Sequence, residues 1–110
     1  MASDASFMDY VMYQIGAAGR VSYRKMFGVY AVYCDGKVVA LACDNQFYLK
    51  PTALGRAVLH EPTEAPPYPG AKPCWLMADQ LDDRALMVDA VRVTASELPL
   101  PKPRAKAKNG

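Results

Sequence analysis

The chain has 110 residues, of which 52% are hydrophobic and 22% are charged. This length and composition fit one globular domain with a single core. No apolar run approaches the ~18 residues that cross a bilayer, and acidic residues stand where a secretion signal would be basic. We therefore expect a cytoplasmic protein that has no membrane partner.

The basic charge is concentrated at the C-terminal end. Apart from the four cations of that end, nine basic residues stand against eleven acidic ones, so the rest of the chain is slightly acidic. Residues 99–110 are rich in proline and contain no acid, which predicts a disordered basic tail after a folded domain over residues 1–98. Nucleic-acid binding through this segment would use Lys102, Arg104, Lys106 and Lys108.

Residue types that usually carry chemistry are few. The three cysteines form no CxxC pair and there is one histidine, His60, so a Cys/His metal site is poorly supplied. We expect three reduced thiols in a cytoplasmic setting. There is no glycine-rich phosphate loop, and nothing orients His60 beside a nucleophile. The sequence predicts no catalytic residues, no metal and no cofactor.

Three segments have helical patterns. The first is Asp4 to Ala18, where apolar residues recur at helical spacing and Gly19 stands at the position of a left-handed C-terminal residue. The second is a short helix that Thr52 can cap and that ends at His60. The third is capped by Asp82 and reaches about Leu98.

Strand patterns fill the space between these helices. Two turn dipeptides, Asp35-Gly36 and Asp44-Asn45, separate three runs rich in Val, Tyr and Ala, which predicts a three-strand antiparallel meander. Its strands are Val29–Cys34, Lys37–Cys43 and Gln46–Lys50. A further strand is expected over Cys74–Ala78, with an edge strand near Pro67–Pro69. The fold class is therefore α+β, with one mainly antiparallel sheet covered by helices on one face.

The register of the meander assigns its side chains to two faces. If both turns have two-residue loops, a small apolar face seats the helices and a second face is wetter. The apolar face consists of Val29, Ala31, Tyr33, Val38, Ala40, Ala42, Phe47 and Leu49. The wetter face consists of Tyr30, Val32, Val39, Leu41, Tyr48 and Lys50, and it is the expected partner-facing side.

A family resemblance rests on the densest part of the chain. Arg24-Lys25-Met26-Phe27-Gly28, the Tyr33-Cys34-Asp35-Gly36 corner and Phe47-Tyr48-Leu49-Lys50 together resemble the N-terminal domain of the TfoX/Sxy family of bacterial competence regulators. Val29 and Ala31 replace two glycines of the family pattern. The resemblance implies the order α-β(3)-α-β(2)-α and a regulatory role in transcription and DNA transformation.

The sequence is compatible with two functions. The first is a non-catalytic regulatory or adaptor domain that binds another protein, with a transcription factor as a candidate partner. Its expected contact residues are Arg24, Lys25, Tyr30, Tyr48 and Lys50. The second is weak nucleic-acid binding, indifferent to sequence, through the basic tail and the Arg24/Lys25 patch.

Overall fold

The computed structural model describes residues 3–99. Within this range three α-helices accompany one six-stranded sheet in the strand order β1-β2-β3-β4-β6-β5, in which every neighbouring pair is antiparallel. The helices are α1 (Ala5–Ile15), α2 (Ala53–Leu59) and α3 (Arg84–Glu97). The strands are β1 (Val21–Met26), β2 (Val29–Cys34), β3 (Lys37–Cys43), β4 (Gln46–Leu49), β5 (Thr63–Ala65) and β6 (Cys74–Met77).

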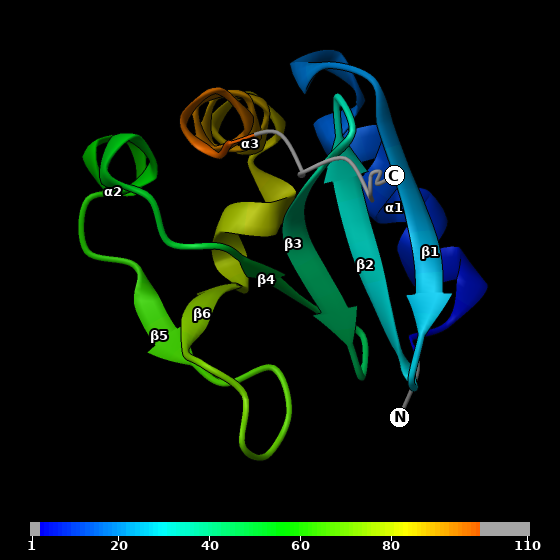
Figure 1. Cartoon of the computed structure of the whole chain (residues 1–110). Coiled ribbons are helices and arrows are strands. Elements are labelled where there is room, and N and C mark those ends of the chain that lie inside the picture. The colour runs from blue at the N-terminus through cyan, green and yellow to red at the C-terminus, as the bar shows by residue number, and fades with distance from the viewer. Residues whose placement is uncertain (1–2, 100–110) are drawn as a thin grey trace, which may run out of the picture.

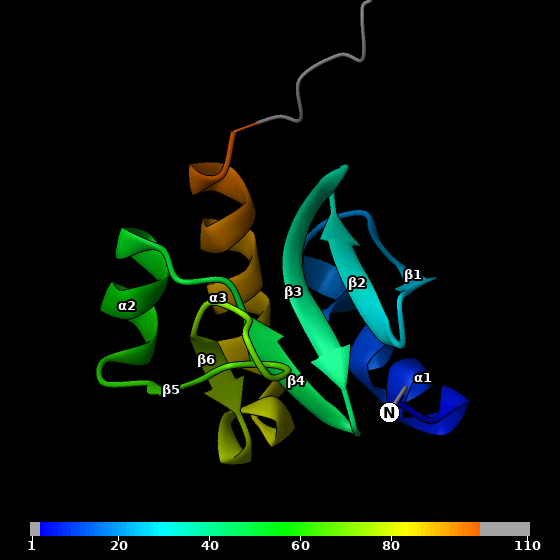
Figure 2. The same ribbon diagram turned by 60° about the horizontal axis from the view of Figure 1, so that its bottom comes forward.

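The helices cover one side of the sheet. Figures 1 and 2 show α1 and α3 behind the sheet, with α2 beside α3. The predicted α+β class, with one antiparallel sheet and helices on one face, is confirmed. The proposed tail over 99–110 lies, apart from Pro99, outside the described residues. We call the two sides of the sheet the helix face and the open face.

The number of strands before α2 is four, where three were predicted. The additional strand, β1, pairs with β2 from Val21↔Cys34 to Met26↔Val29. Phe27 and Gly28 form the turn between them, with φ of 49° and 83°. Positive φ at both central residues matches the twist of a two-residue hairpin. The chain therefore begins its meander one hairpin earlier than the sequence pattern predicted.

A β-bulge in β3 makes part of the predicted face assignment wrong. The pairing shifts between Val32↔Ala40 and Tyr33↔Val38, so Val39 is an extra residue. As a result Tyr30 and Val32 lie on the helix face, and Val39 belongs to the main core. Four residues that were expected beneath the helices are on the open face: Val29, Ala31 and Tyr33 of β2, and Val38 of β3, which is opposite Tyr33. The assignment of β3 and β4 was right for Ala40, Ala42, Phe47, Leu49, Leu41 and Tyr48.

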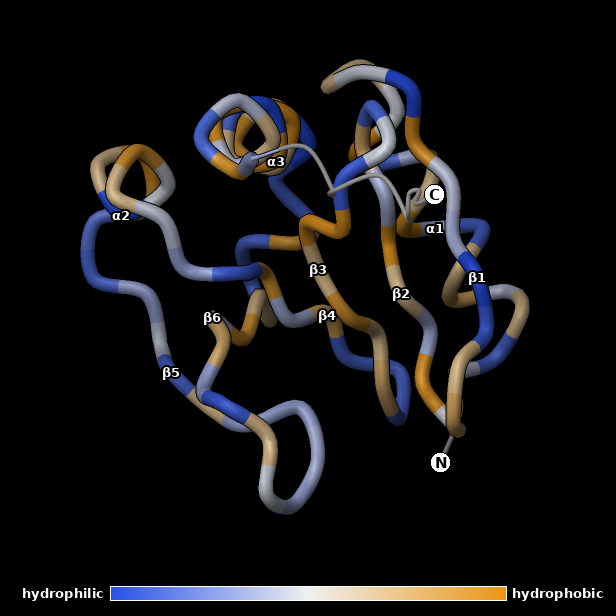
Figure 3. Tube along the Cα trace, viewed as in Figure 1, coloured by the Kyte–Doolittle hydropathy of each residue, from blue (hydrophilic) through white to orange (hydrophobic). Residues whose placement is uncertain are grey.

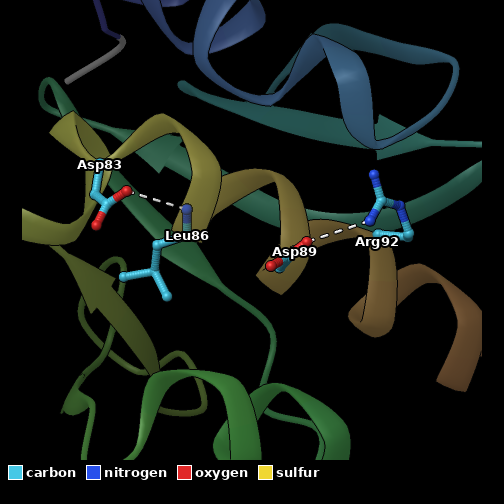
Figure 4. A network of polar contacts seen from close by, with 4 residues as sticks. All are labelled: Asp83, Leu86, Asp89 and Arg92. Carbon is cyan, nitrogen blue, oxygen red and sulfur yellow. Dashed lines mark hydrogen bonds and ion pairs between the residues drawn. The ribbon is translucent and has the colours of Figure 1, made fainter.

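The ends of several elements also differ from the predictions. The second edge strand is Thr63–Ala65 and not Pro67–Pro69. Helix α3 is capped by Asp83, whose carboxylate accepts a hydrogen bond from the Leu86 N–H at 3.1 Å, because Asp82 belongs to a preceding 3-10 turn (Figure 4). Gly19 is extended, and a Cβ there would meet the Cys34 Sγ and the Asp35 carboxylate at 2.9 Å.

The main core fills the helix face. Its largest fully buried side chains come from the sheet and from helices α1 and α3. Hydrophobic segments run along β2, β3 and these helices (Figure 3). Helix α2 joins this core through Leu59 at its C-terminal end, and hydrogen bonds fix its N-terminal end. The Thr52 hydroxyl accepts a hydrogen bond from the Gly55 N–H at 3.0 Å, as the predicted cap requires, and the Glu97 carboxylate accepts from the N–H groups of Ala53 and Leu54.

Gly55 is a packing glycine, and the Gly55→Ala variant is expected to be about 1–2 kcal/mol less stable. A Cβ there would lie 2.7 Å from the Thr52 Oγ1 and 2.9 Å from the Trp75 ring. That overlap outweighs the gain of up to about 1 kcal/mol in helix propensity. Gly16→Ala is the matched control, because Gly16 has a helical backbone and nothing within 4 Å of its Cβ position. Urea denaturation should give the two variants opposite signs.

Candidate functional site

The open face carries an apolar cavity beside the β1–β2 turn. Its volume is about 480 Å³. We call its lining, together with the turn, the hairpin surface. It consists of Met26, Phe27, Gly28, Val29, Leu41, Cys43 and Tyr68.

Three parts of the fold meet at the hairpin surface. Met26 and Val29 are opposite each other across the first hairpin, and Leu41 is opposite Ala31 on the next strand. Residues that are opposite in a ladder project to the same face, so the hairpin aligns the floor of the cavity. Tyr68 comes from the loop between β5 and β6, where the Ala71 N–H donates to the Tyr68 carbonyl at 3.1 Å and closes a turn.

Phe27 is the most unusual residue of this surface. Its side chain is fully exposed, at 101% of the reference area, and its φ is 49°. A bulky residue in the left-handed region is a genuine outlier, and left-handed backbone costs roughly 1–2 kcal/mol for a residue with a Cβ. Because the ring is exposed, it makes no packing contacts that would offset this backbone cost. The position therefore opposes folding stability, which is how backbone strain at functional sites presents itself.

The predicted contact residues do not form one surface. Tyr30 is half-buried on the helix face, and its ring meets that of Tyr23 edge-on at 5.3 Å. Tyr48 is on the open face but is only 6% exposed, in a small cluster with Cys43 and Cys74. The expectation that Tyr30 and Tyr48 are neighbours on one exposed side is wrong, because the bulge in β3 turns β2 over relative to the predicted register.

Burial changes the pKa values of two groups in the open-face cluster. Burial raises the pKa of the Tyr48 hydroxyl, which donates a hydrogen bond to the Gln46 side chain at 2.8 Å. Burial also raises the pKa of the Cys74 thiol, and the nearby charge of Lys50 opposes this with a smaller effect. A raised thiol pKa leaves little thiolate at neutral pH, so Cys74 is poorly suited to act as a nucleophile.

The three thiols are also badly placed for pairing with one another. Cys34 belongs to the helix-face core, whereas Cys43 and Cys74 are on the open face. Strand β4 lies between the strands that carry Cys43 and Cys74, which sets those two strands roughly 9–10 Å apart. A disulfide needs Cα atoms within about 7 Å. The expectation of three reduced thiols remains a prediction.

The predicted basic residues are dispersed. Arg24 and Lys25 are exposed neighbours on β1, but Arg24 is opposite Ala31 and projects to the open face, whereas Lys25 is opposite Tyr30 and projects to the helix face. Lys50 follows β4, with β2 and β3 between it and β1. The tail cations Lys102, Arg104, Lys106 and Lys108 lie outside the described residues.

Residues 3–99 contain no group of three or more His, Cys, Asp or Glu side chains that could hold a metal ion. His60 is exposed at the C-terminal end of α2, where its N–H donates to the Arg56 carbonyl. None of the described helices has the length and apolar character needed to cross a bilayer.

Comparison with known proteins identifies the family of this domain. The family model of the TfoX N-terminal domain matches residues 13–98, which is most of the chain and includes the hairpin surface. The chain belongs to this family. This TfoX N-terminal domain is also 48% identical over 108 residues to an uncharacterized 12.7 kDa protein in the trpE 5′ region of Spirochaeta aurantia. The match covers 98% of this chain and 93% of that relative.

Sequence reasoning missed Phe27 as a site residue, although the residue was part of the family pattern. The missing information was β1 itself. Once Val21–Met26 is a strand, Phe27-Gly28 is a two-residue turn between two strands, and an aromatic residue at its tip has nothing to pack against. The alternation of Val21 and Tyr23 with Ser22 was the available signal in the sequence of this TfoX N-terminal domain.

Proposed function

We propose that this domain is a non-catalytic regulatory or adaptor module that binds another protein through the hairpin surface. The observation that carries the proposal is Phe27, an aromatic ring that is fully exposed on a strained turn beside an apolar cavity of about 480 Å³. Aromatic anchors beside pockets are the residues that dominate protein–protein binding energies. Bound protein would cover the ring and recover the stability that the turn gives up.

Family membership supports the regulatory part of the proposal. The chain belongs to the TfoX N-terminal domain family, and its resemblance to regulators of competence makes a protein of the transcription machinery the candidate partner. Nucleic acid is the competing partner, through the basic tail and the exposed Arg24/Lys25 pair. The hairpin surface is apolar and favours protein, because phosphate backbones are held by cations and not by aliphatic walls.

The test is a capture experiment with the full chain from an extract of the source cell, with and without nuclease. We expect a protein that stays bound after nuclease treatment and after deletion of residues 99–110, and whose affinity is then measured with the purified pair. Capture that vanishes on nuclease treatment or on tail deletion would instead support the nucleic-acid function.

A further inference from the structure

The two edges of the sheet differ in their availability to a partner. The β5 edge has only three residues and is bracketed by Pro62 and Pro66. Short strands and flanking prolines are common means of protecting an edge from pairing. The β1 edge has six residues without proline, and all but the first are exposed. Figure 1 shows β1 at the outer side of the sheet, with α1 behind it. Of the two sheet edges formed by residues 3–99, only β1 therefore offers a long strand.

The register shows which backbone groups of β1 face outward. The Phe27-Gly28 turn joins Met26 and Val29, so these two exchange the hydrogen bonds of the hairpin. Bonded and non-bonded pairs alternate along an antiparallel ladder. The next non-bonded residues on β1 are Lys25 and Tyr23, and each directs its N–H and C=O away from β2. An additional strand would find these donors and acceptors spaced as in any antiparallel or parallel ladder.

The charges along this edge discriminate between occupants. Among residues 3–99, the side chains of Arg24 and Lys25 make no ion pair or hydrogen bond, and β1 contains no acidic residue. Pairing of β1 with a second copy of itself would gather the cations of both chains along one seam, and like charges that face each other across strands are destabilising. A strand with acidic residues reverses the sign of the same interaction. The charges of β1 therefore disfavour pairing with a second copy of β1 and favour an acidic partner.

We infer that β1 accepts an extended acidic segment of the protein partner as a seventh strand, an inference that rests on the proposed function. Two consecutive carboxylates fit best, because successive residues of a strand point to opposite faces and Arg24 and Lys25 do the same. A segment that continues past Met26 arrives at the hairpin surface, where an apolar side chain can enter the cavity. Backbone pairing then supplies affinity and the side-chain contacts supply specificity.

The first measurement uses two fluorescent ten-residue probes with the full chain. Both probes are strand-forming sequences of alternating threonine and valine, one with a central Glu-Glu pair and one with Lys-Lys. Fluorescence anisotropy should show the acidic probe binding at least about tenfold more tightly than the basic one. Equal affinities, or no binding of the acidic probe, would overturn the inference.

The second measurement separates strand addition from simple charge attraction. Lys25→Ala and Lys25→Pro both lose the cation, but only the proline variant loses an N–H, and that N–H points away from β2. We expect the acidic probe to bind the proline variant about fivefold more weakly than the alanine variant, which is the effect of one net hydrogen bond. Unchanged amide resonances of β2 and β3 would establish that the hairpin is intact.

The outcomes distinguish this inference from the proposed function. Equal binding by the Lys25→Ala and Lys25→Pro variants refutes strand addition, and the hairpin surface can still be tested with the captured partner through Phe27. A captured partner that is insensitive to Phe27 refutes the proposed function, whatever the acidic probe does at β1.

Discussion

The Phe27→Asn variant is expected to be about 0.5–1 kcal/mol more stable than the wild type, because asparagine tolerates the left-handed backbone that phenylalanine resists. No packing is lost in exchange, since the ring is fully exposed. The same variant should bind the captured protein partner at least about 30-fold more weakly, as expected when an aromatic anchor worth 2 kcal/mol or more is removed. The measurements are urea denaturation and titration calorimetry with the purified partner.

Tyr13→Ala is the matched control for this experiment. Tyr13 is also a largely exposed aromatic residue, at 65% of the reference area, but it lies on α1 beneath Arg84 and away from the hairpin surface. Its removal should change partner affinity by less than about twofold, as most residues outside a hot spot do. A Phe27→Asn variant that loses stability, or that keeps full affinity, would contradict the proposed role of the turn.

The second large effect concerns Trp75, whose replacement by alanine should lower the free energy of unfolding by about 3–5 kcal/mol. Trp75 is 1% exposed and lies on the helix face of β6. The Arg56 guanidinium lies over its ring at 5.4 Å from the centroid, and Gly55 approaches it from the same helix. Helix α2 has seven residues, too few to be stable alone, so it depends on this ring.

The comparison for Trp75 is its neighbour Leu76, which is half-buried and projects to the open face. Leu76→Ala should lower the free energy of unfolding by about 1 kcal/mol, because this substitution removes less buried apolar area than Trp75→Ala does. Far-UV circular dichroism in urea follows both variants without relying on tryptophan emission. Equal losses in the two variants would mean that the core is not concentrated on the helix face.

The elements predicted correctly are those that local sequence signals, such as turn dipeptides and helix caps, are sufficient to define. The two turn dipeptides, which have positive φ at Asp35, Gly36, Asp44 and Asn45, delimit β3 as expected, and Thr52 caps α2. Strand β1 was missed because consecutive cations interrupt its alternation. The faces of β2 were inverted because no local pattern announces the extra residue at Val39. Such bulges are set by packing across the sheet and not by neighbours in the chain.

Prediction of the candidate site was limited by the same two features. Arg24 and Lys25 were identified as exposed cations, and this agrees with the structure. Tyr48 was expected to be exposed, but it is buried with Cys43 and Cys74 in a cluster against which Ala65 of β5 and Leu76 of β6 pack, and a strand pattern alone does not reveal this. Phe27 could be identified as a site residue only once the turn between β1 and β2 was known.

The bulge in β3 also affects how this sequence should be aligned with its relatives. Val39 is the residue inside the strand that has no counterpart opposite it on β2, between the paired residues Val38 and Ala40. A homologue that lacks a residue here would restore regular pairing between the two strands, and every other side chain would keep its face. A one-residue gap at Val39 would therefore leave the two faces of the sheet unchanged. A deletion in β3 that left the bulge in place would exchange the two faces of the strand on one side of the deletion.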